Sequence, residues 1–177
     1  MNFEFSSDQM LLKDQARKFL ENEESVKKAR EVLEGDQTHD ESLWRSVVEM
    51  GWTATTIPEE FDGLGLGYLE LCVIAEELGR SLAPTPFSSS VYLATEALIN
   101  QGSKEQHQKY LPKLAAGEIV GTLAHTETTS SPSPENLNCE LKNNKLNGTK
   151  IAVIDGDVAN FAVVSAKEGD KVVLGLV

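Results

Sequence analysis

The sequence predicts an α+β protein, with an all-helical N-terminal domain followed by an incomplete antiparallel β domain. Apolar residues in the first two-thirds of the chain recur at the spacing of amphipathic helices. After Gly117 the chain changes to short β-rich segments separated by turn residues such as Asn147-Gly148. We therefore expect a helical domain over residues 1–118 and a partial β domain over residues 119–177.

Start and stop residues mark each expected helix. Ser6 with Gln9, and Ser103 with Gln106, have the spacing of a capping box, and Asp40 can cap a helix of its own. The expected helices cover residues 6–20, 23–34, 40–50, 68–82, 91–99 and 103–116.

The remaining segments are expected to be loops or strands. Residues 53–58 are β-branched and end in proline, so we expect an extended or irregular path. Residues 61–67 are rich in glycine and predict a loop. The last predicted strand reaches residue 177, which is why the β domain is expected to be incomplete. Strands are expected at residues 119–124, 137–142, 150–154, 161–166 and 171–177.

Composition excludes several classes of function. The net charge of −12 argues against nucleic-acid binding, which needs clustered Lys and Arg. The sequence contains no apolar run long enough for a membrane span, and we expect no signal peptide because residues 1–5 show neither a basic start nor an apolar stretch. Cys72 and Cys139 are far apart and are expected to be free thiols in a reducing cytoplasm, and the histidines lack metal-ligand spacing.

Local patterns alone do not identify a chemistry. The glycine-rich residues 61–67 do not match a phosphate loop, so a tight surface loop is favoured over a ligand site. Glu76 and Glu77 are adjacent on a helix and are expected to be solvated carboxylates. His125 lies close to Glu127, but alternation along a strand weakens a His–acid pair. No catalytic residue and no metal site is therefore assigned.

Several motifs in consistent order resemble the acyl-CoA dehydrogenase family. They are Gly-Trp followed by Ile-Pro-Glu-Glu at residues 51–60, Glu-Glu-Leu-Gly-Arg at 76–80, the Gly-Ser to Gly-Glu run at 102–118, and Leu-Asn-Gly-Thr-Lys at 146–150. The resemblance covers nearly the whole chain and corresponds to the first helical domain and most of the following β domain of that family.

The resemblance implies a flavin enzyme acting on acyl-CoA thioesters. In the family, a Glu on a C-terminal helical domain removes the α-proton, the FAD accepts the β-hydride, and electrons pass to an electron-transfer flavoprotein. The family's C-terminal domain does not correspond to any part of this sequence, so we expect the chain by itself to be inactive. Family members assemble into oligomers, so a homo- or hetero-oligomer is expected.

The same resemblance places the flavin contacts at Ala124, Thr126, Glu127, Ala152 and Ile154. The Thr126-Glu127 pair matches the family motif T-E-P-x-A-G-S-D. Ala152 stands where an aromatic wall is common, and Ile154 stands where a hydroxyl is common. These departures predict that the chain binds FAD weakly or not at all.

Further departures lie between these two segments. Thr128 replaces the motif's proline, and residues 130–133 do not reproduce its A-G-S-D run. Three hypotheses stay open: a divergent FAD enzyme, a flavin-poor partner subunit of a heteromeric acyl-CoA dehydrogenase, and a helical interaction domain.

Overall fold

A computed structural model of the protein describes residues 4–129, 133 and 136–177. In this part of the chain, six α-helices and three other helical segments precede and flank a five-stranded sheet. The α-helices are α1 (Ser7–Asn22), α2 (Ser25–Glu34), α3 (Glu41–Glu49), α4 (Tyr68–Arg80), α5 (Glu96–Gln101) and α6 (Lys104–Ala115). Two 3-10 turns, η1 (Trp52–Ala54) and η2 (Glu59–Phe61), and a π-helix, η3 (Ser88–Thr95), lie between them.

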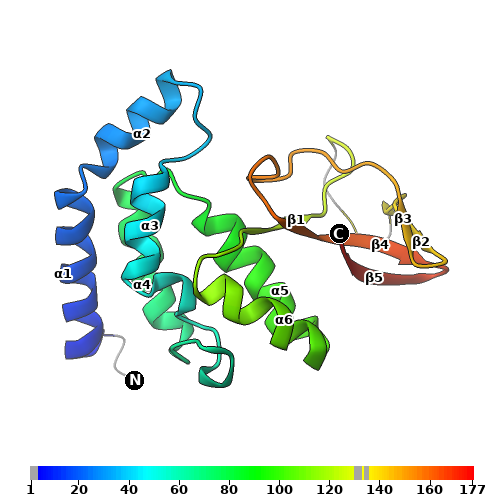
Figure 1. Ribbon diagram of the computed structural model, residues 1–177, viewed down its shortest axis with the longest axis horizontal. Coiled ribbons are helices and arrows are strands. Elements are labelled where there is room, and N and C mark those ends of the chain that lie inside the picture. The colour runs from blue at the N-terminus through cyan, green and yellow to red at the C-terminus, as the bar shows by residue number, and fades with distance from the viewer. Residues whose placement is uncertain (1–3, 130–132, 134–135) are drawn as a thin grey trace.

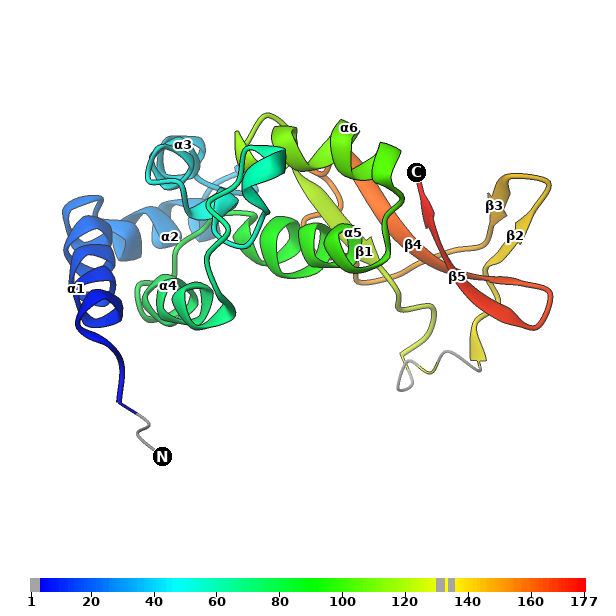
Figure 2. The same ribbon diagram turned by 90° about the horizontal axis from the view of Figure 1, so that it is seen from below.

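The helices and the sheet lie at opposite ends of an elongated molecule (Figure 1). Helices α1, α3 and α4 form one end, α2 projects from it, and α5 and α6 lie between this end and the sheet. Figure 2 shows α5 and α6 lying against β1 and β4. The strands are β1 (Gly121–Ala124), β2 (Glu140–Lys142), β3 (Lys145–Asn147), β4 (Phe161–Glu168) and β5 (Lys171–Leu176).

The predicted helix starts are confirmed at atomic detail. Ser6 and Gln9 form both hydrogen bonds of a capping box, and Ser103 and Gln106 do the same. The Asp40 carboxylate accepts a hydrogen bond from the backbone N–H of Leu43 at 2.7 Å. These caps satisfy N–H groups that lack partners within the helix, which explains why short-range sequence signals locate the helix starts.

The α+β class is confirmed, but the sheet is mixed and not purely antiparallel. β2 with β3 and β4 with β5 are antiparallel neighbours. In contrast, β1 pairs with β4 in parallel, with Gly121 opposite Phe161, and β2 also runs parallel to β4. A short turn forces two strands to be antiparallel, whereas the long segment between β1 and β4 allows either direction.

The strand expected at residues 150–154 is absent, and β3 lies at Lys145–Asn147 instead. Ala152 and Asp155 have φ angles of 50° and 51°, in the left-handed region that a strand cannot contain. The helix expected at residues 91–99 also differs, because the π-helix η3 begins earlier and continues directly into α5.

The glycine-rich loop at residues 61–67 is a packing element, as expected of a tight loop. Its backbone N–H groups at Leu64 and Leu66 donate to Ala54 and Thr55. A Cβ at Gly63 would lie 1.8 Å from the carbonyl oxygen of Ile57. Glycine is therefore required at this position for close approach of two backbone segments, which explains the motif without a ligand.

The expectation of a solvated Glu77 is wrong. Its side chain is 0% exposed, and its carboxylate accepts hydrogen bonds from Arg17 of α1 at 2.7 and 3.0 Å. Arg80 donates to the same carboxylate at 2.8 Å. The pKa of Glu77 falls to about 2, because the hydrogen bond from Arg17 and the second one from Arg80 outweigh the cost of burial.

The hydrophobic core has three parts that together position the β segment. One lies among α1, α3, α4 and η3, and a second joins α5 and α6 to Phe161 and Val163 of β4. A third small cluster includes Ala124, Cys139 and Ala166. The second cluster thus holds β1 and β4 against the helices. β1 pairs with β4 along one edge, and its other edge can pair with another segment of the chain.

Candidate functional site

Residues 150–154 run along the edge of β1 that does not pair with β4. The backbone N–H of Ile151 donates to the carbonyl of Thr126 at 2.8 Å. At the other end, the Thr122 hydroxyl donates to the carbonyl of Ile154 at 2.6 Å. The two segments that were expected to contact a flavin therefore lie side by side, although they are far apart in the sequence.

A buried ion pair fixes this arrangement. Lys150 Nζ lies 2.7 Å from Glu127 Oε1, and each side chain is 8% exposed. Lys150 also donates to the carbonyl of His125 at 3.2 Å. The Glu127 carboxylate accepts from the backbone N–H groups of Asn138 and Cys139 at 2.6 and 3.0 Å.

The surroundings of Glu127 keep its carboxylate ionised. Burial acts to raise the pKa of Glu127, but the hydrogen bond from Lys150 and those from two backbone N–H groups act in the opposite direction. Their combined effect lowers the pKa of Glu127 to about 2. A carboxylate with every oxygen engaged is a structural anchor and is poorly suited to act as a catalytic base.

His125 bonds to a residue that the sequence analysis did not single out. Its Nδ1 lies 2.9 Å from the Ser165 hydroxyl, which also accepts from Lys150 at 3.1 Å. Ser165 is buried in β4. Ser165 stands among the apolar residues of that strand, and such a serine in a sequence can indicate a buried polar contact.

The predicted site residues divide into buried and exposed members. Ala124 is 5% exposed in β1. Thr126 and Glu127 follow that strand; Thr126 is half-buried, and the Glu127 side chain is 8% exposed. Ala152 is exposed, and Ile154 is 52% exposed on the neighbouring segment. Of residues 130–133, Ser130, Ser131 and Pro132 lie outside the described residues.

A separate cavity of about 220 Å³ lies among α4, η3 and the segment between them, and none of the candidate flavin contacts lines it. Ser89, the residue after the lining residue Ser88, donates its hydroxyl to Asp155 at 2.6 Å, so η3 contacts both the cavity and the segment that follows Ile154. Burial raises the pKa of Tyr92 to about 12, so its phenol stays protonated. The cavity walls are mostly apolar and come from α4, η3 and the segment between them: Ala75, Leu78, Gly79, Leu82, Ala83, Thr85, Phe87, Ser88 and Tyr92.

The side chains fit a flavin only in part. The paired backbones of residues 124–127 and 151–154 form an exposed edge against which a planar ring could lie. Ala152 and Ile154 contribute neither an aromatic ring nor a hydroxyl to that edge. In the described part of the chain, no three His, Cys, Asp or Glu side chains gather around a possible metal position. No helix within the described residues combines the length and apolar character required to cross a membrane.

Comparison with known proteins gives consistent matches. The family model described as "Acyl-CoA dehydrogenase, N-terminal domain" matches residues 6–118. Mitochondrial isovaleryl-CoA dehydrogenase from Arabidopsis thaliana is 32% identical over 173 residues, covering 94% of this chain and 42% of that protein.

Two solved structures match over the full length of the chain. One is the ChsE4-ChsE5 complex from Mycobacterium tuberculosis, with a TM-score of 0.87, 26% identity and 48% of that chain covered. The other is described as the electron-transferring flavoprotein of Acidaminococcus fermentans, with a TM-score of 0.81, 30% identity and 49% coverage. The chain spans less than half of the length of these relatives.

Proposed function

The chain belongs to the acyl-CoA dehydrogenase family, and we propose that it forms part of a flavoprotein that dehydrogenates an acyl-CoA thioester between its α and β carbons. The observation that carries this proposal is the edge formed by residues 124–127 and 150–154, which η3 connects to an apolar cavity. Such a reaction needs an acyl chain and a hydride acceptor held close together, and we assign the cavity to the chain and the edge to the acceptor.

The residues of this chain bind and position; none is assigned as the base. Lys150 and Glu127 hold the 150–154 segment against β1. The apolar walls of the cavity exclude water from a bound acyl chain, and the protonated phenol of Tyr92 offers a hydrogen-bond donor. FAD, when bound, would supply hydride acceptance, and the proton-abstracting carboxylate would come from a part of the protein outside residues 1–177.

A partner-subunit role is the second candidate function. Ala152 and Ile154 are exposed on the flavin-facing edge and lack the ring and hydroxyl that the resemblance leads one to expect there. This chain would then supply architecture to a heteromeric assembly in which another subunit holds FAD. The similarity to a chain of the ChsE4-ChsE5 complex supports a heteromeric arrangement.

Three further properties are proposed by family membership. The electron acceptor is an electron-transfer flavoprotein, and the assembly is a homo- or hetero-oligomer. The location is a reducing compartment, for which we propose the cytoplasm because Cys72 and Cys139 are both free.

The test combines a flavin titration with a turnover assay. Purified protein is titrated with FAD and then assayed with an artificial electron acceptor and a panel of acyl-CoA thioesters that includes isovaleryl-CoA. We expect no stoichiometric FAD binding and no turnover by residues 1–177 alone. Turnover that is lost on replacing any carboxylate within this chain would refute the assignment of the base elsewhere. Recovery of turnover when a C-terminal family domain is supplied supports the enzyme over the helical interaction domain.

A further inference from the structure

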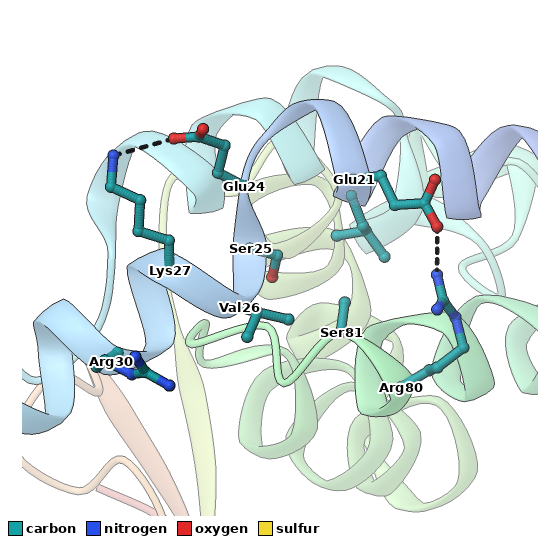
Figure 3. Close-up of a pocket in the computed structure, with 9 residues that line it drawn as sticks. Glu21, Glu24, Ser25, Val26, Lys27, Arg30, Arg80 and Ser81 are labelled. Atoms are coloured by element: carbon teal, nitrogen blue, oxygen red, sulfur yellow. Dashed lines mark hydrogen bonds and ion pairs between the residues drawn. The ribbon is translucent and has the colours of Figure 1, made fainter.

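A second cavity, of about 440 Å³, lies where α1 ends, α2 begins and α4 ends (Figure 3). None of its residues belongs to the candidate flavin-facing site. The lining combines an apolar part with charged and hydroxyl side chains: Leu20, Glu21, Glu24, Ser25, Val26, Lys27, Arg30, Arg80 and Ser81.

The buried hydroxyl of Ser25 has no hydrogen-bond partner. Ser25 is the first residue of α2 and is 1% exposed, yet it lines this cavity. Figure 3 shows Ser25, Val26 and Ser81 close together at the cavity. A buried hydroxyl without a partner is costly, so its presence beside a cavity points to a group that can bond to it.

The start of α2 offers additional donors at the same place. Its N-cap residue, Glu24, is in a left-handed conformation and makes no side-chain cap. Within the described residues, the first helical N–H groups with backbone partners are those of Lys27 and Lys28. The N–H groups of Ser25 and Val26 are therefore left at the positive end of a ten-residue helix.

Among the charged side chains that line the cavity, one cation has no anionic partner within the described residues. Arg80 pairs with Glu21 at 3.0 Å, and Lys27 pairs with Glu24 at 3.1 Å, both visible in Figure 3. Arg30 makes no ion pair within the described part of the chain. The cavity therefore matches a ligand with a single negative charge, since a second charge would face Glu21 and Glu24.

We propose that this cavity binds a small monocarboxylate with a short apolar tail. The carboxylate accepts hydrogen bonds from the free N–H groups at the start of α2 and pairs with Arg30. The Ser25 hydroxyl, which loses no bond by changing rotamer, turns to donate to it. The tail packs against Leu20 and Val26, which form the apolar wall. The proposal is independent of the flavin-facing site and of the proposed dehydrogenation.

The probe is butyrate, titrated into the protein and followed by calorimetry and by the amide signals of Ser25 and Val26 in NMR spectra. Inorganic phosphate, used at a pH well above its second ionisation so that it carries two charges, tests the single-charge requirement, and neutral butyramide tests the need for a carboxylate. We expect saturable binding of butyrate, weaker binding of phosphate, and none of butyramide. Tighter binding of phosphate than of butyrate, or no saturable binding of butyrate, overturns the proposal.

Two variants and a matched control locate the binding. Arg30→Gln should weaken butyrate binding at least tenfold, whereas Arg45→Gln, at an exposed arginine on α3, should leave it unchanged. Ser25→Ala should raise the melting temperature without butyrate, because it removes an unpaired hydroxyl, and should reduce the shift that butyrate produces. Equal binding by wild type, Arg30→Gln and Ser25→Ala overturns the assignment to this cavity. A lower melting temperature of Ser25→Ala without butyrate also contradicts it, since the hydroxyl would then have a partner within the protein.

Discussion

Lys150 Nζ and Glu127 Oε1 lie 2.7 Å apart with each side chain only 8% exposed, and this contact joins the two segments of the candidate site. Lys27 and Glu24 form a pair of similar length, but both side chains are 65% exposed. Water screens the exposed Lys27–Glu24 pair, but it has little access to the buried Lys150–Glu127 pair. The buried pair therefore helps to hold Ala152 and Ile154 beside β1, together with the hydrogen bonds of Ile151 and Ile154 to that segment.

Glu127→Gln should destabilise the protein strongly at neutral pH and weakly at low pH. The substitution leaves Lys150 charged, buried and without its anion, which should cost about 3 kcal/mol. The folded-state pKa of Glu127 is about 2, below the reference value of 4.5. Its stabilisation is therefore complete above pH 4.5 and is lost as the pH falls from there towards 2.

Urea unfolding of wild type and Glu127→Gln between pH 7 and pH 3 measures this effect. The difference in unfolding free energy should shrink below about pH 4.5. Glu140→Gln, at an exposed carboxylate on β2, is the matched control and should show a small difference at every pH. A difference for Glu127→Gln that does not vary with pH would contradict the ionised anchor.

Glu77→Gln should lower the free energy of unfolding by about 3 kcal/mol, because charged hydrogen bonds from two arginines lose their acceptor charge. The neighbouring substitution Glu76→Gln is the control. Glu76 is 53% exposed and makes one ion pair, with Lys13, so its loss should cost about 0.5 kcal/mol. Chemical denaturation of both variants gives the comparison, and equal losses would show that α1 and α4 do not depend on the buried carboxylate.

Local sequence signals predicted the helical part well. The Ser6–Gln9 and Ser103–Gln106 capping boxes act within one helical turn, so the sequence alone contains all their partners. Glu77 was misjudged because its partner Arg17 lies on another helix. Only tertiary packing brings that guanidinium to the carboxylate, and the adjacent Glu76 gives no hint of the difference in burial.

The sequence predicted that residues 119–177 contain β-strands, but it did not predict which strands pair or in which direction. The parallel contact of Gly121 with Phe161 depends on the path of the whole connecting segment, which carries no local signal. Residues 150–154 have the composition of a strand, but a strand cannot accommodate the left-handed backbone at Ala152. The Lys150–Glu127 pair likewise depended on the fold. Glu127 was among the expected flavin contacts, whereas Lys150 was known only as the last residue of a family motif.

Ala152→Gly should raise the free energy of unfolding by about 0.5 kcal/mol. Ala152 has a φ of 50° and is exposed, so glycine relieves backbone strain without removing buried contacts. The gain is limited because glycine also increases the entropy of the unfolded chain. Ala159→Gly is the control and should destabilise, since Ala159 is not among the residues with positive φ. Destabilisation by Ala152→Gly would show that the methyl group makes a contact that matters.

Ile154→Thr should strengthen FAD binding in a complete chain that includes the C-terminal domain. Ile154 is 52% exposed, and its carbonyl is held by Thr122 at 2.6 Å, so the backbone position should persist after the substitution. A threonine hydroxyl at this place adds a donor worth about 1 kcal/mol, or roughly a fivefold gain in affinity. Ala152→Trp would add a ring as well, but a bulky side chain is disfavoured at the left-handed φ of Ala152. The threonine variant is therefore the cleaner test.

Flavin fluorescence titrations of wild type, Ile154→Thr and Val172→Thr measure the effect. Val172 is an exposed apolar residue of β5, 47% exposed, and its substitution controls for a general change in surface polarity. A gain for Ile154→Thr alone places the flavin edge at residues 150–154 and favours a divergent enzyme whose cofactor site has been weakened. If both threonine variants bind FAD like wild type, the edge is not the flavin contact. The partner-subunit role is then favoured, because the paired geometry of the two segments would serve assembly and not cofactor binding.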